Sequence, residues 1–181
     1  MDKVMQRVGT LKEKFLTFEN LYTAYKKAYR STKNYTSHKF TFHVEKELLL
    51  LQKDLTEENY VPGEYYYFTI HEPKERVISI AQFRDRVVHH ALVNILEPIY
   101  EKQFVFDSYA TRKGKGTHKA IERAQSFIRK NRWYLKMDVK KFFNSINHDV
   151  INSAIQRKIK DRYILDLCSK IIAKAGDGIE G

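Results

Sequence analysis

The stretch from Trp133 to His148 limits most strongly what this chain can fold into. It opens with a strict alternation of apolar and polar residues, which predicts a half-buried strand ending at Asp138. Two bulky rings, Phe142 and Phe143, follow within five residues. A strand that ends in an exposed carboxylate, followed by a turn and an aromatic ring, can hold a metal ion beside a shaped pocket. Mg²⁺ favours carboxylate oxygens together with substrate phosphates. The alternative is that Asp138 only caps a turn.

The charge of the chain favours a polyanionic partner. Its 181 residues include 33 Lys and Arg against 22 Asp and Glu, a formal net charge of +11. A chain this basic most often binds nucleic acid, and an anionic membrane surface is the less common partner. The 12 Tyr and 11 Phe residues suit a groove that tracks a phosphate backbone and stacks bases, although the same rings can form a core. The length allows one domain, or one domain and part of another.

No targeting or membrane segment is expected. The sequence contains no run of 18 apolar residues, and its first residues lack the apolar core of a signal peptide. The one cysteine, Cys168, lies in an apolar helical run and has no internal disulfide partner. We therefore expect a reduced, cytoplasmic setting and no membrane partner.

Helical periodicity dominates the first part of the chain. The spacing predicts a helix over 10–32, with one aromatic stripe that we expect to pack inward. The polar and basic stretch 31–39 is interpreted as a loop, and a second helix is predicted over 42–55. The rings of the stripe belong to Phe15, Phe18, Tyr22, Tyr25 and Tyr29.

Two β-rich runs, Tyr65–Ile70 and Arg76–Ile80, predict a hairpin. Lys74 and Arg76 lie at or beside its tip. A hairpin tip with these two cations can fold over a triphosphate, because an ammonium acts as a point charge and a guanidinium as a fork. The alternative is a solvated loop that happens to be basic.

A helix is predicted over 82–100, and its first turns carry Arg84, Asp85 and Arg86. An aspartate suits the positive end of the helix dipole, whereas two arginines oppose it. The arginines are therefore expected to have partners elsewhere, such as carboxylates or phosphate. The alternative is a simple surface network of salt bridges.

A basic, glycine-rich loop precedes the next helix. In this loop Arg112, Lys113 and Lys115 alternate with Gly114 and Gly116. The glycines let the backbone come close to a ligand, and cations before a helix N-terminus favour an anion. The spacing is not that of a Walker loop, so the prediction is a generic phosphate-binding loop.

Three helices are predicted for the remainder. The first runs from the glycine-rich loop to about Lys130 with an apolar face inward, the second begins after Asn147 as its N-cap, and the third carries Cys168 on its buried side. The residues expected to be buried on the first of these helices are Ala120, Ile121, Ala124, Phe127 and Ile128.

Taken in order, these segments resemble the reverse transcriptases of bacterial retroelements, those of group II introns and of diversity-generating retroelements. The resemblance rests on residues 74–80 with 83–92 for the first fingers motif, on 106–118 for the second, and on 135–148 for the first palm motif. Three motifs in register are far more specific than any one of them. The wording of residues 106–118 is closest to the diversity-generating branch.

The resemblance implies an α+β fold, with helical and hairpin fingers followed by the beginning of a polymerase palm. Residues 1–130 would be the fingers region and residues 131–181 the first part of the palm. The implied activity is that of an RNA-directed DNA polymerase, which copies an RNA template into cDNA from a DNA or RNA primer. The implied ligands are deoxynucleoside triphosphates and two Mg²⁺ ions. The diversity-generating branch adds a small basic helical accessory protein.

The resemblance also implies roles for single residues at the reaction centre. Asp138 would be a metal-binding catalytic aspartate, with the carbonyl of Val139 as a further metal ligand. Phe143 would lie under the sugar and reject a 2′-hydroxyl, while Lys74 and Arg76 would contact the incoming triphosphate. Such a site needs two metal ions about 4 Å apart, which clamp the attacking and the leaving oxygen.

The glycine-rich loop is implied to touch nucleic acid. Arg112, together with Lys113 and Lys115, would lie along the backbone of the template or primer. Removing each phosphate contact is expected to reduce the slope of log affinity against log salt by roughly one.

One departure from the family pattern affects activity. The Tyr-x-Asp-Asp motif, which carries the other metal-binding carboxylates of the family, does not occur, and the sequence contains no Asp-Asp pair. We therefore expect this chain to be a fragment of an active enzyme, and we expect the isolated 181 residues not to extend a primer. The alternative is a shortened, non-catalytic module that binds RNA or a protein partner.

Overall fold

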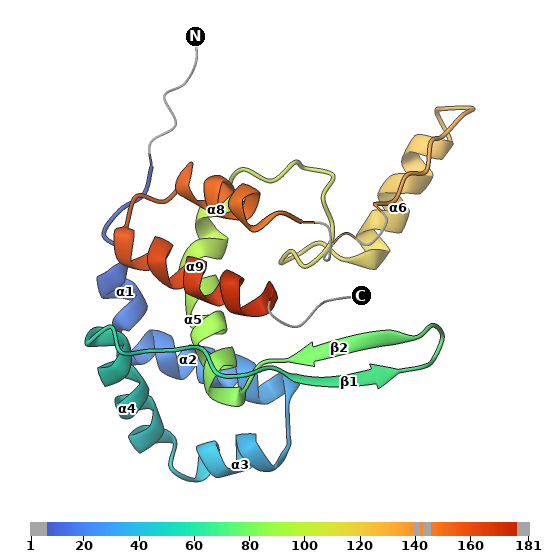
Figure 1. Ribbon diagram of the computed structural model, residues 1–181. Helices are drawn as coiled ribbons and strands as arrows, with labels where there is room; N and C mark the ends of the chain where they lie inside the picture. Colours follow the sequence, from blue (N-terminus) through green and yellow to red (C-terminus); the bar gives the residue numbers. More distant parts are fainter. Residues whose placement is uncertain (1–6, 140–141, 143–145, 177–181) are drawn as a thin grey trace. The chain divides into compact units, whose positions relative to one another are not determined.

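The computed structural model has the expected α+β fold, and it describes residues 7–139, 142 and 146–176, without the side chains of 175 and 176. It divides into two compact units, Met1–Leu96 with Ile146–Gly181 and Glu97–Ser145, and each is taken by itself. The first unit contains α1 (Lys12–Leu16), α2 (Phe18–Ser31), α3 (Tyr35–Phe42), α4 (Val44–Thr56), β1 (Tyr66–Ile70), β2 (Arg76–Ile80), most of α5 (Phe83–Glu101), α8 (His148–Gln156) and α9 (Arg162–Gly176) (Figure 1). The second contains the end of α5 and α6 (Thr117–Ile128).

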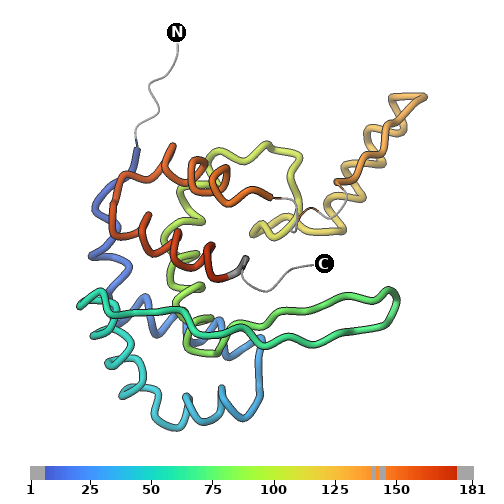
Figure 2. Tube along the Cα trace, viewed as in Figure 1, coloured from blue at the N-terminus to red at the C-terminus, as the bar shows by residue number. Residues whose placement is uncertain are grey.

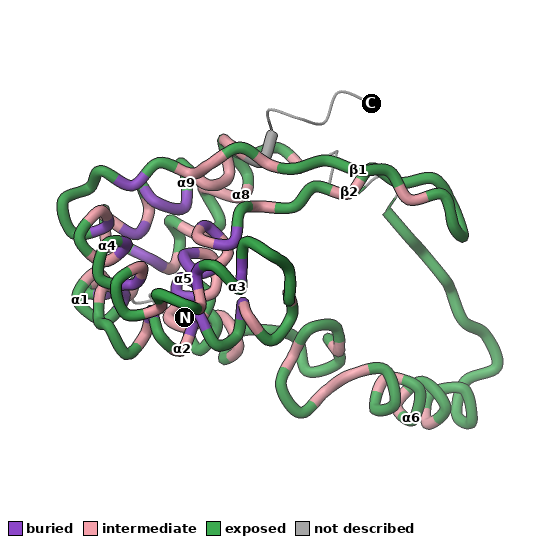
Figure 3. Tube along the Cα trace, turned by 90° about the horizontal axis from the view of Figure 1, so that it is seen from below, coloured by how far each residue is buried: buried purple, intermediate pink, exposed green. Residues whose placement is uncertain are grey.

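The core of the first unit is helical. Fully buried side chains come from α1, α2, α4 and α5, and also from the far end of the chain at Ile159 and Ile164 (Figure 3, purple). Of the aromatic stripe, Phe15 and Tyr25 are buried, whereas Phe18 and Tyr22 are 38% and 40% exposed. The inward packing predicted for the stripe is therefore confirmed for two of its rings and wrong for two others.

The helix predicted over 10–32 is in fact two helices, α1 and α2. Thr17 between them is extended (φ −61°, ψ 139°), and its hydroxyl accepts a hydrogen bond from the backbone N–H of Asn20 at 3.2 Å. Thr17 is thus the N-cap of α2. The helical period continues across the break, so periodicity alone did not show it.

The loop predicted over 31–39 is wrong for its second half, where α3 begins. Asn34 and Ser37 form a reciprocal capping box: each side-chain oxygen accepts the other residue's backbone N–H, both at 2.9 Å. This pair satisfies two N–H groups that a helix start would leave unpaired, which stabilises a helix that a polar composition conceals.

The two ends of the first unit are joined by a backbone bridge and by one carboxylate. Val8 pairs with Ile159 in a parallel bridge. One oxygen of Asp161 accepts the backbone N–H groups of Leu11 and the next residue at 2.7 and 2.9 Å, and the other accepts that of Ile164 at 3.3 Å. Asp161 therefore caps the starts of both α1 and α9, about 150 residues apart in sequence.

The predicted hairpin is confirmed. The strands β1 and β2 pair antiparallel, with Tyr66 opposite Ile80 and Ile70 opposite Arg76. Most of their side chains are exposed, and the two strands run out from the helical body of the first unit as a narrow ribbon (Figure 2). Among the described residues, no helix is both long and apolar enough to cross a lipid bilayer.

The strand predicted over 133–138 is wrong. Residues 133–139 carry no strand assignment, and their apolar side chains are exposed, Trp133 at 84% and Leu135 at 81%. A strand needs a hydrogen-bonded neighbour, and within the described part of the chain β1 and β2 form the only sheet. Alternation in the sequence thus indicates which face of a strand would be buried, but it does not show whether a neighbouring strand is present.

The buried face predicted for α6 is also wrong. Ile121, Phe127 and Ile128 are 50%, 45% and 64% exposed. The period of the apolar residues correctly predicted a helix, because that pattern depends on the segment alone. Burial depends on what packs against the segment, and no described residue of the second unit covers this face enough to bury it.

Candidate nucleotide and nucleic-acid interface

The two cations of the hairpin lie where the sequence predicted them. Lys74 lies in the turn between the strands, and Arg76 is the first residue of β2. Both side chains are exposed at the outer end of the ribbon. An exposed ammonium and guanidinium at this position can contact a polyphosphate from solvent.

The root of the hairpin is fixed by a buried carboxylate on α5. Asp85 is 4% exposed, and its two oxygens accept the hydroxyl of Tyr60 at 2.7 Å and the backbone N–H of Gly63 at 2.9 Å. Burial, followed by the hydrogen bond to Asp85, raises the pKa of the Tyr60 hydroxyl, so that it remains a donor. Both partners belong to the segment that leads into β1.

The arginines that flank Asp85 have partners inside the protein. Arg84 pairs with the Asp54 carboxylate and lies over the Tyr60 ring at 5.6 Å. Arg86 donates to the hydroxyl of Thr32 and, at 2.8 Å, to that of Ser31. Burial lowers the pKa of the Arg86 guanidinium. Arg84 therefore has a carboxylate partner, in a partly exposed salt bridge, whereas Arg86 has two hydroxyls in place of the carboxylate or phosphate that was expected.

In the second unit, Arg112 holds the basic loop together. Its guanidinium donates to the Glu101 carboxylate at 2.6–3.1 Å and to the carbonyls of Val105 and Ser108 at 2.8 and 3.0 Å. The side chain is 9% exposed. The hydrogen bond between them raises the pKa of Arg112 and lowers that of Glu101. A direct contact of Arg112 with nucleic acid stays a prediction, and the observed bonds give it a role in shaping the loop.

An open depression of about 540 Å³ lies beside this loop. It is lined by Phe106, Tyr109, Lys115, Lys119, Glu122 and Arg123, among others. The Lys115 ammonium lies 3.7 Å from the ring centroid of Phe106 and 4.8 Å from that of Tyr109. Cations held against aromatic faces are the combination that tracks a single-stranded backbone and stacks bases.

Internal bonds keep the shape of the depression. Arg123 binds the Asp107 carboxylate through two nitrogens at 2.8 and 3.2 Å, and Tyr109 donates to the same carboxylate at 3.0 Å. These hydrogen bonds, that of Arg123 first, lower the pKa of Asp107. Lys119 donates to the carbonyl of Gly114 at 2.7 Å.

Both loop glycines have the backbone conformation that glycine alone adopts easily. Their φ angles are +72° for Gly114 and +113° for Gly116, and no atom of the described residues lies within 4 Å of where a Cβ would stand. The conformation, not crowding, therefore requires glycine at these two positions. Lys113 between Arg112 and Gly114 is exposed, and Gly116 is the N-cap of α6.

The predicted metal ligands lie in the second unit and are exposed. Asp138 and Val139 belong to the irregular stretch after α6, where the Val139 side chain is 61% exposed. Phe143 lies outside the described residues. Within the residues that the structure describes, no group of three or more His, Cys, Asp or Glu side chains could hold a metal ion.

Sequence reasoning missed several residues of the depression. Phe106 and Tyr109 were counted only as part of a motif, and Lys119 and Arg123 were not singled out. A signal was present, because Lys119 and Arg123 are four residues apart on α6 and so share one face of the helix. The acidic partners Glu101 and Asp107 had no sequence signal, since their pairing depends on the path of the loop.

Comparison with known families assigns the chain. Residues 70–177, more than half of its length, match the family described as reverse transcriptase (RNA-dependent DNA polymerase). The chain belongs to this family. The three motifs that carried the resemblance lie inside the matched region.

Its relatives include intron-encoded proteins. Protein YkfC of Escherichia coli is 30% identical over 72% of this chain and 36% of its own length. The group II intron-encoded protein LtrA of Lactococcus lactis is 27% identical over 90% of this chain and 27% of its own length. Nuclear intron maturase 1, mitochondrial, of Arabidopsis thaliana is 36% identical over 47% of this chain and 12% of its own length. The chain therefore spans about a third or less of the length of these relatives.

Proposed function

We propose that this chain forms the nucleotide-contacting and first metal-binding parts of an RNA-directed DNA polymerase. The observation that carries the proposal is the family match over residues 70–177, which includes the hairpin tip, the basic loop and Asp138. The structure adds support because Lys74 and Arg76 are exposed on an ordered hairpin. In this proposal residues 1–130 serve as fingers and residues 131–181 as the first part of the palm.

The hairpin cations would bind and orient the incoming deoxynucleoside triphosphate. Lys74 supplies a compact charge, and the Arg76 guanidinium can donate two parallel hydrogen bonds to phosphate oxygens. Nucleotidyl transfer leaves little covalent chemistry for the protein, so alignment and charge neutralisation provide most of the rate enhancement. The two side chains would therefore act on the bound triphosphate as well as in the transition state, where charge gathers on the leaving pyrophosphate.

Asp138 and the Val139 carbonyl have the donor chemistry that Mg²⁺ requires. Both offer hard oxygens, and Asp138 is exposed so that substrate phosphates can complete the coordination. Bound there, Mg²⁺ would stabilise the attacking and leaving oxygens of an in-line displacement. One carboxylate does not hold two ions, so we propose that further carboxylates of the natural protein complete the site.

The depression of the second unit would hold the backbone of a template or primer strand. In the depression Lys115 provides charge and the rings of Phe106 and Tyr109 provide stacking faces, and the exposed Lys113 adds charge in the same loop. Arg112, bonded to Glu101, would act by holding the loop. Phe143 would exclude a ribose 2′-hydroxyl, as the family resemblance implies.

The class of RNA template is a narrower question. The names of the relatives favour intron RNA, whereas the wording of residues 106–118 favours a template-repeat RNA copied with a small basic accessory protein. The two proposals are separated by sequencing the RNA and cDNA that copurify with the natural protein. Intron sequence supports the first, and mutated repeat cDNA the second.

The test of the proposed activity is primer extension on an RNA template by the natural protein. Asp138→Ala is expected to lower Mg²⁺-dependent extension by at least about 10²-fold. The matched control is Asp166→Ala, which removes an exposed aspartate on α9 and is expected to leave extension unchanged. Extension that survives Asp138→Ala would contradict the proposed metal ligand.

A further inference from the structure

Among the residues that the structure describes, none buries the sides of the hairpin that carries Lys74 and Arg76. Three consecutive residues of β1, Tyr66, Tyr67 and Phe68, are exposed at 38–70%, and β2 is exposed at all but one residue. A two-stranded ribbon is marginal by itself. Its direction must therefore be set at its root.

The root is where Asp85 gathers the two legs of the hairpin. The leg before β1 is held by the hydrogen bonds from Tyr60, which is 2% exposed, and from the partly buried Gly63. The leg after β2 reaches α5 through Ala81 and Gln82, and the Gln82 side chain would come within 2.7 Å of a Cβ on Gly63. A single carboxylate thus ties the incoming leg to the helix that receives the outgoing leg.

Asp85 is also firmly fixed in the helical body. It lies in the first turn of α5, between Arg84, which pairs with Asp54 of α4, and Arg86, which binds the hydroxyls at the end of α2. Phe83, the first residue of α5, packs edge-on against Phe40 with ring centroids 5.2 Å apart. The position of the carboxylate is therefore fixed by contacts of α5 with α2, α3 and α4, and the carboxylate in turn fixes the start of the hairpin.

We propose that Asp85 is a positioning residue: it fixes the direction in which the hairpin leaves α5, and so the place of Lys74 beside the nucleotide. The expected effect on nucleotide binding rests on the proposed function. The expected effect on the direction of the hairpin rests only on the contacts of Asp85. A five-residue strand extends about 17 Å, so a tilt of about 10° at the root moves the tip by about 3 Å. Misplacement of a catalytic group by about 1 Å can lower the rate on the order of 10²-fold. A small change of angle at Asp85 would therefore displace Lys74 enough to lower the rate.

The first experiment measures the direction of the hairpin relative to α4, in the absence of nucleotide. Spin labels are placed at Thr69→Cys on β1 and Lys53→Cys on α4, both exposed positions of the first unit, in a Cys168→Ala background. Pulsed electron resonance then gives the distribution of distances between them. One narrow distribution is expected for the parent, and a broader or displaced one for Tyr60→Phe and Asp85→Ala.

The matched control is Tyr25→Phe. This change also removes the hydroxyl of a buried tyrosine in the first unit. That hydroxyl donates to Thr41 at 3.0 Å, and the variant keeps the ring, which packs against Phe40 and Phe83. A general loss of stability would broaden the distances in both tyrosine variants, whereas positioning broadens them in Tyr60→Phe alone. Unchanged distances in folded Tyr60→Phe would overturn the proposal, and this variant decides the matter if Asp85→Ala does not fold.

The second experiment measures the functional consequence in the natural protein. Tyr60→Phe is expected to raise the KM for deoxynucleoside triphosphate about tenfold with a much smaller change in the KM for primer–template. Lys74→Ala is measured alongside. If Lys74→Ala leaves the nucleotide KM unchanged, the proposed function of the hairpin fails even when the distances confirm that Asp85 aims it. An unchanged nucleotide KM in Tyr60→Phe beside a raised one in Lys74→Ala overturns the positioning role.

Discussion

At the scale of single residues, burial decides the reactivity of Cys168. The thiol is 6% exposed, and burial raises its pKa to about 11. Because the thiolate is the nucleophile, only about 0.1% of the group is reactive at pH 8. We expect a disulfide reagent to label the folded chain very slowly and the chain in denaturant within minutes. Equal labelling rates with and without denaturant would show that the thiol is accessible.

Burial also makes α5 sensitive to acid through His89 and His90. Burial lowers the pKa of both imidazoles, with Asp85 partly opposing this for His89. The folded state therefore binds fewer protons than the unfolded one, so stability is full above the unfolded pKa of about 6.5 and is lost as the pH falls below it. We expect the urea midpoint to decrease between pH 7.5 and pH 5.5, and to decrease less in His89→Gln. The exposed His43→Gln is the control, and a pH response equal to that of the parent in His89→Gln would refute the assignment.

At the scale of elements, Asp161 is the residue whose loss affects two helices together. Its carboxylate accepts backbone N–H groups at the starts of α1 and α9. Asp161→Ala leaves these donors unpaired, and we expect the free energy of unfolding to decrease by about 1–3 kcal/mol. Denaturant unfolding measures the change, with Asp166→Ala on the exposed side of α9 as control. A decrease no larger than that of the control would mean that water replaces the cap.

The elements also show what a sequence can predict. The hairpin and the helices α4, α5, α6, α8 and α9 were predicted, because periodicity, turn residues and the Asn147 cap are local signals. The start of α3 was missed because its capping box is made of two polar residues in a polar stretch. The strand ending at Asp138 was predicted and is not formed, since a strand depends on a neighbour that a local pattern does not contain.

At the scale of the whole molecule, the sequence predicted which residues lie at the candidate site better than it predicted the contacts that these residues make. The sequence placed Lys74 and Arg76 on a hairpin tip and a cationic glycine loop before α6, and the structure agrees. It did not show that Arg112 binds Glu101 or that Asp85 holds the hairpin root, because both depend on residues brought together by folding. The roles of Asp138, Val139 and Phe143 stay predictions that rest on the family.

The charge of the whole chain predicts how its affinity for nucleic acid depends on salt. Lys113 is exposed, and Lys115 lines the depression of the second unit. If each contacts a phosphate, Lys113→Ala and Lys115→Ala each reduce the slope of log affinity against log salt for an RNA–DNA duplex by about one, because one fewer counterion is released.

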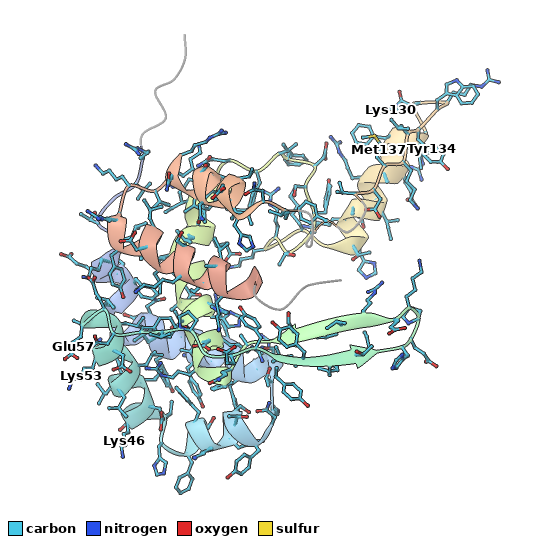
Figure 4. The ribbon with its side chains drawn as sticks, in the orientation of Figure 1. Lys46, Lys53, Glu57, Lys130, Tyr134 and Met137 are labelled. Carbon is cyan, nitrogen blue, oxygen red and sulfur yellow. The ribbon has the colours of Figure 1, made fainter. Side chains whose placement is uncertain are left out.

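Lys53→Ala is the matched control for this measurement. Lys53 lies with Glu57 on the exposed side of α4 in the first unit (Figure 4), and its ammonium is 3.9 Å from the Glu57 carboxylate. A net charge of +11 gives any surface lysine some long-range effect, but outside the contact area that effect is screened within about 10 Å at 0.1 M salt. The slope should therefore change in the two loop variants and not in Lys53→Ala. Equal changes in all three would mean that the duplex responds to overall charge, and unchanged slopes would make the loop a solvated surface.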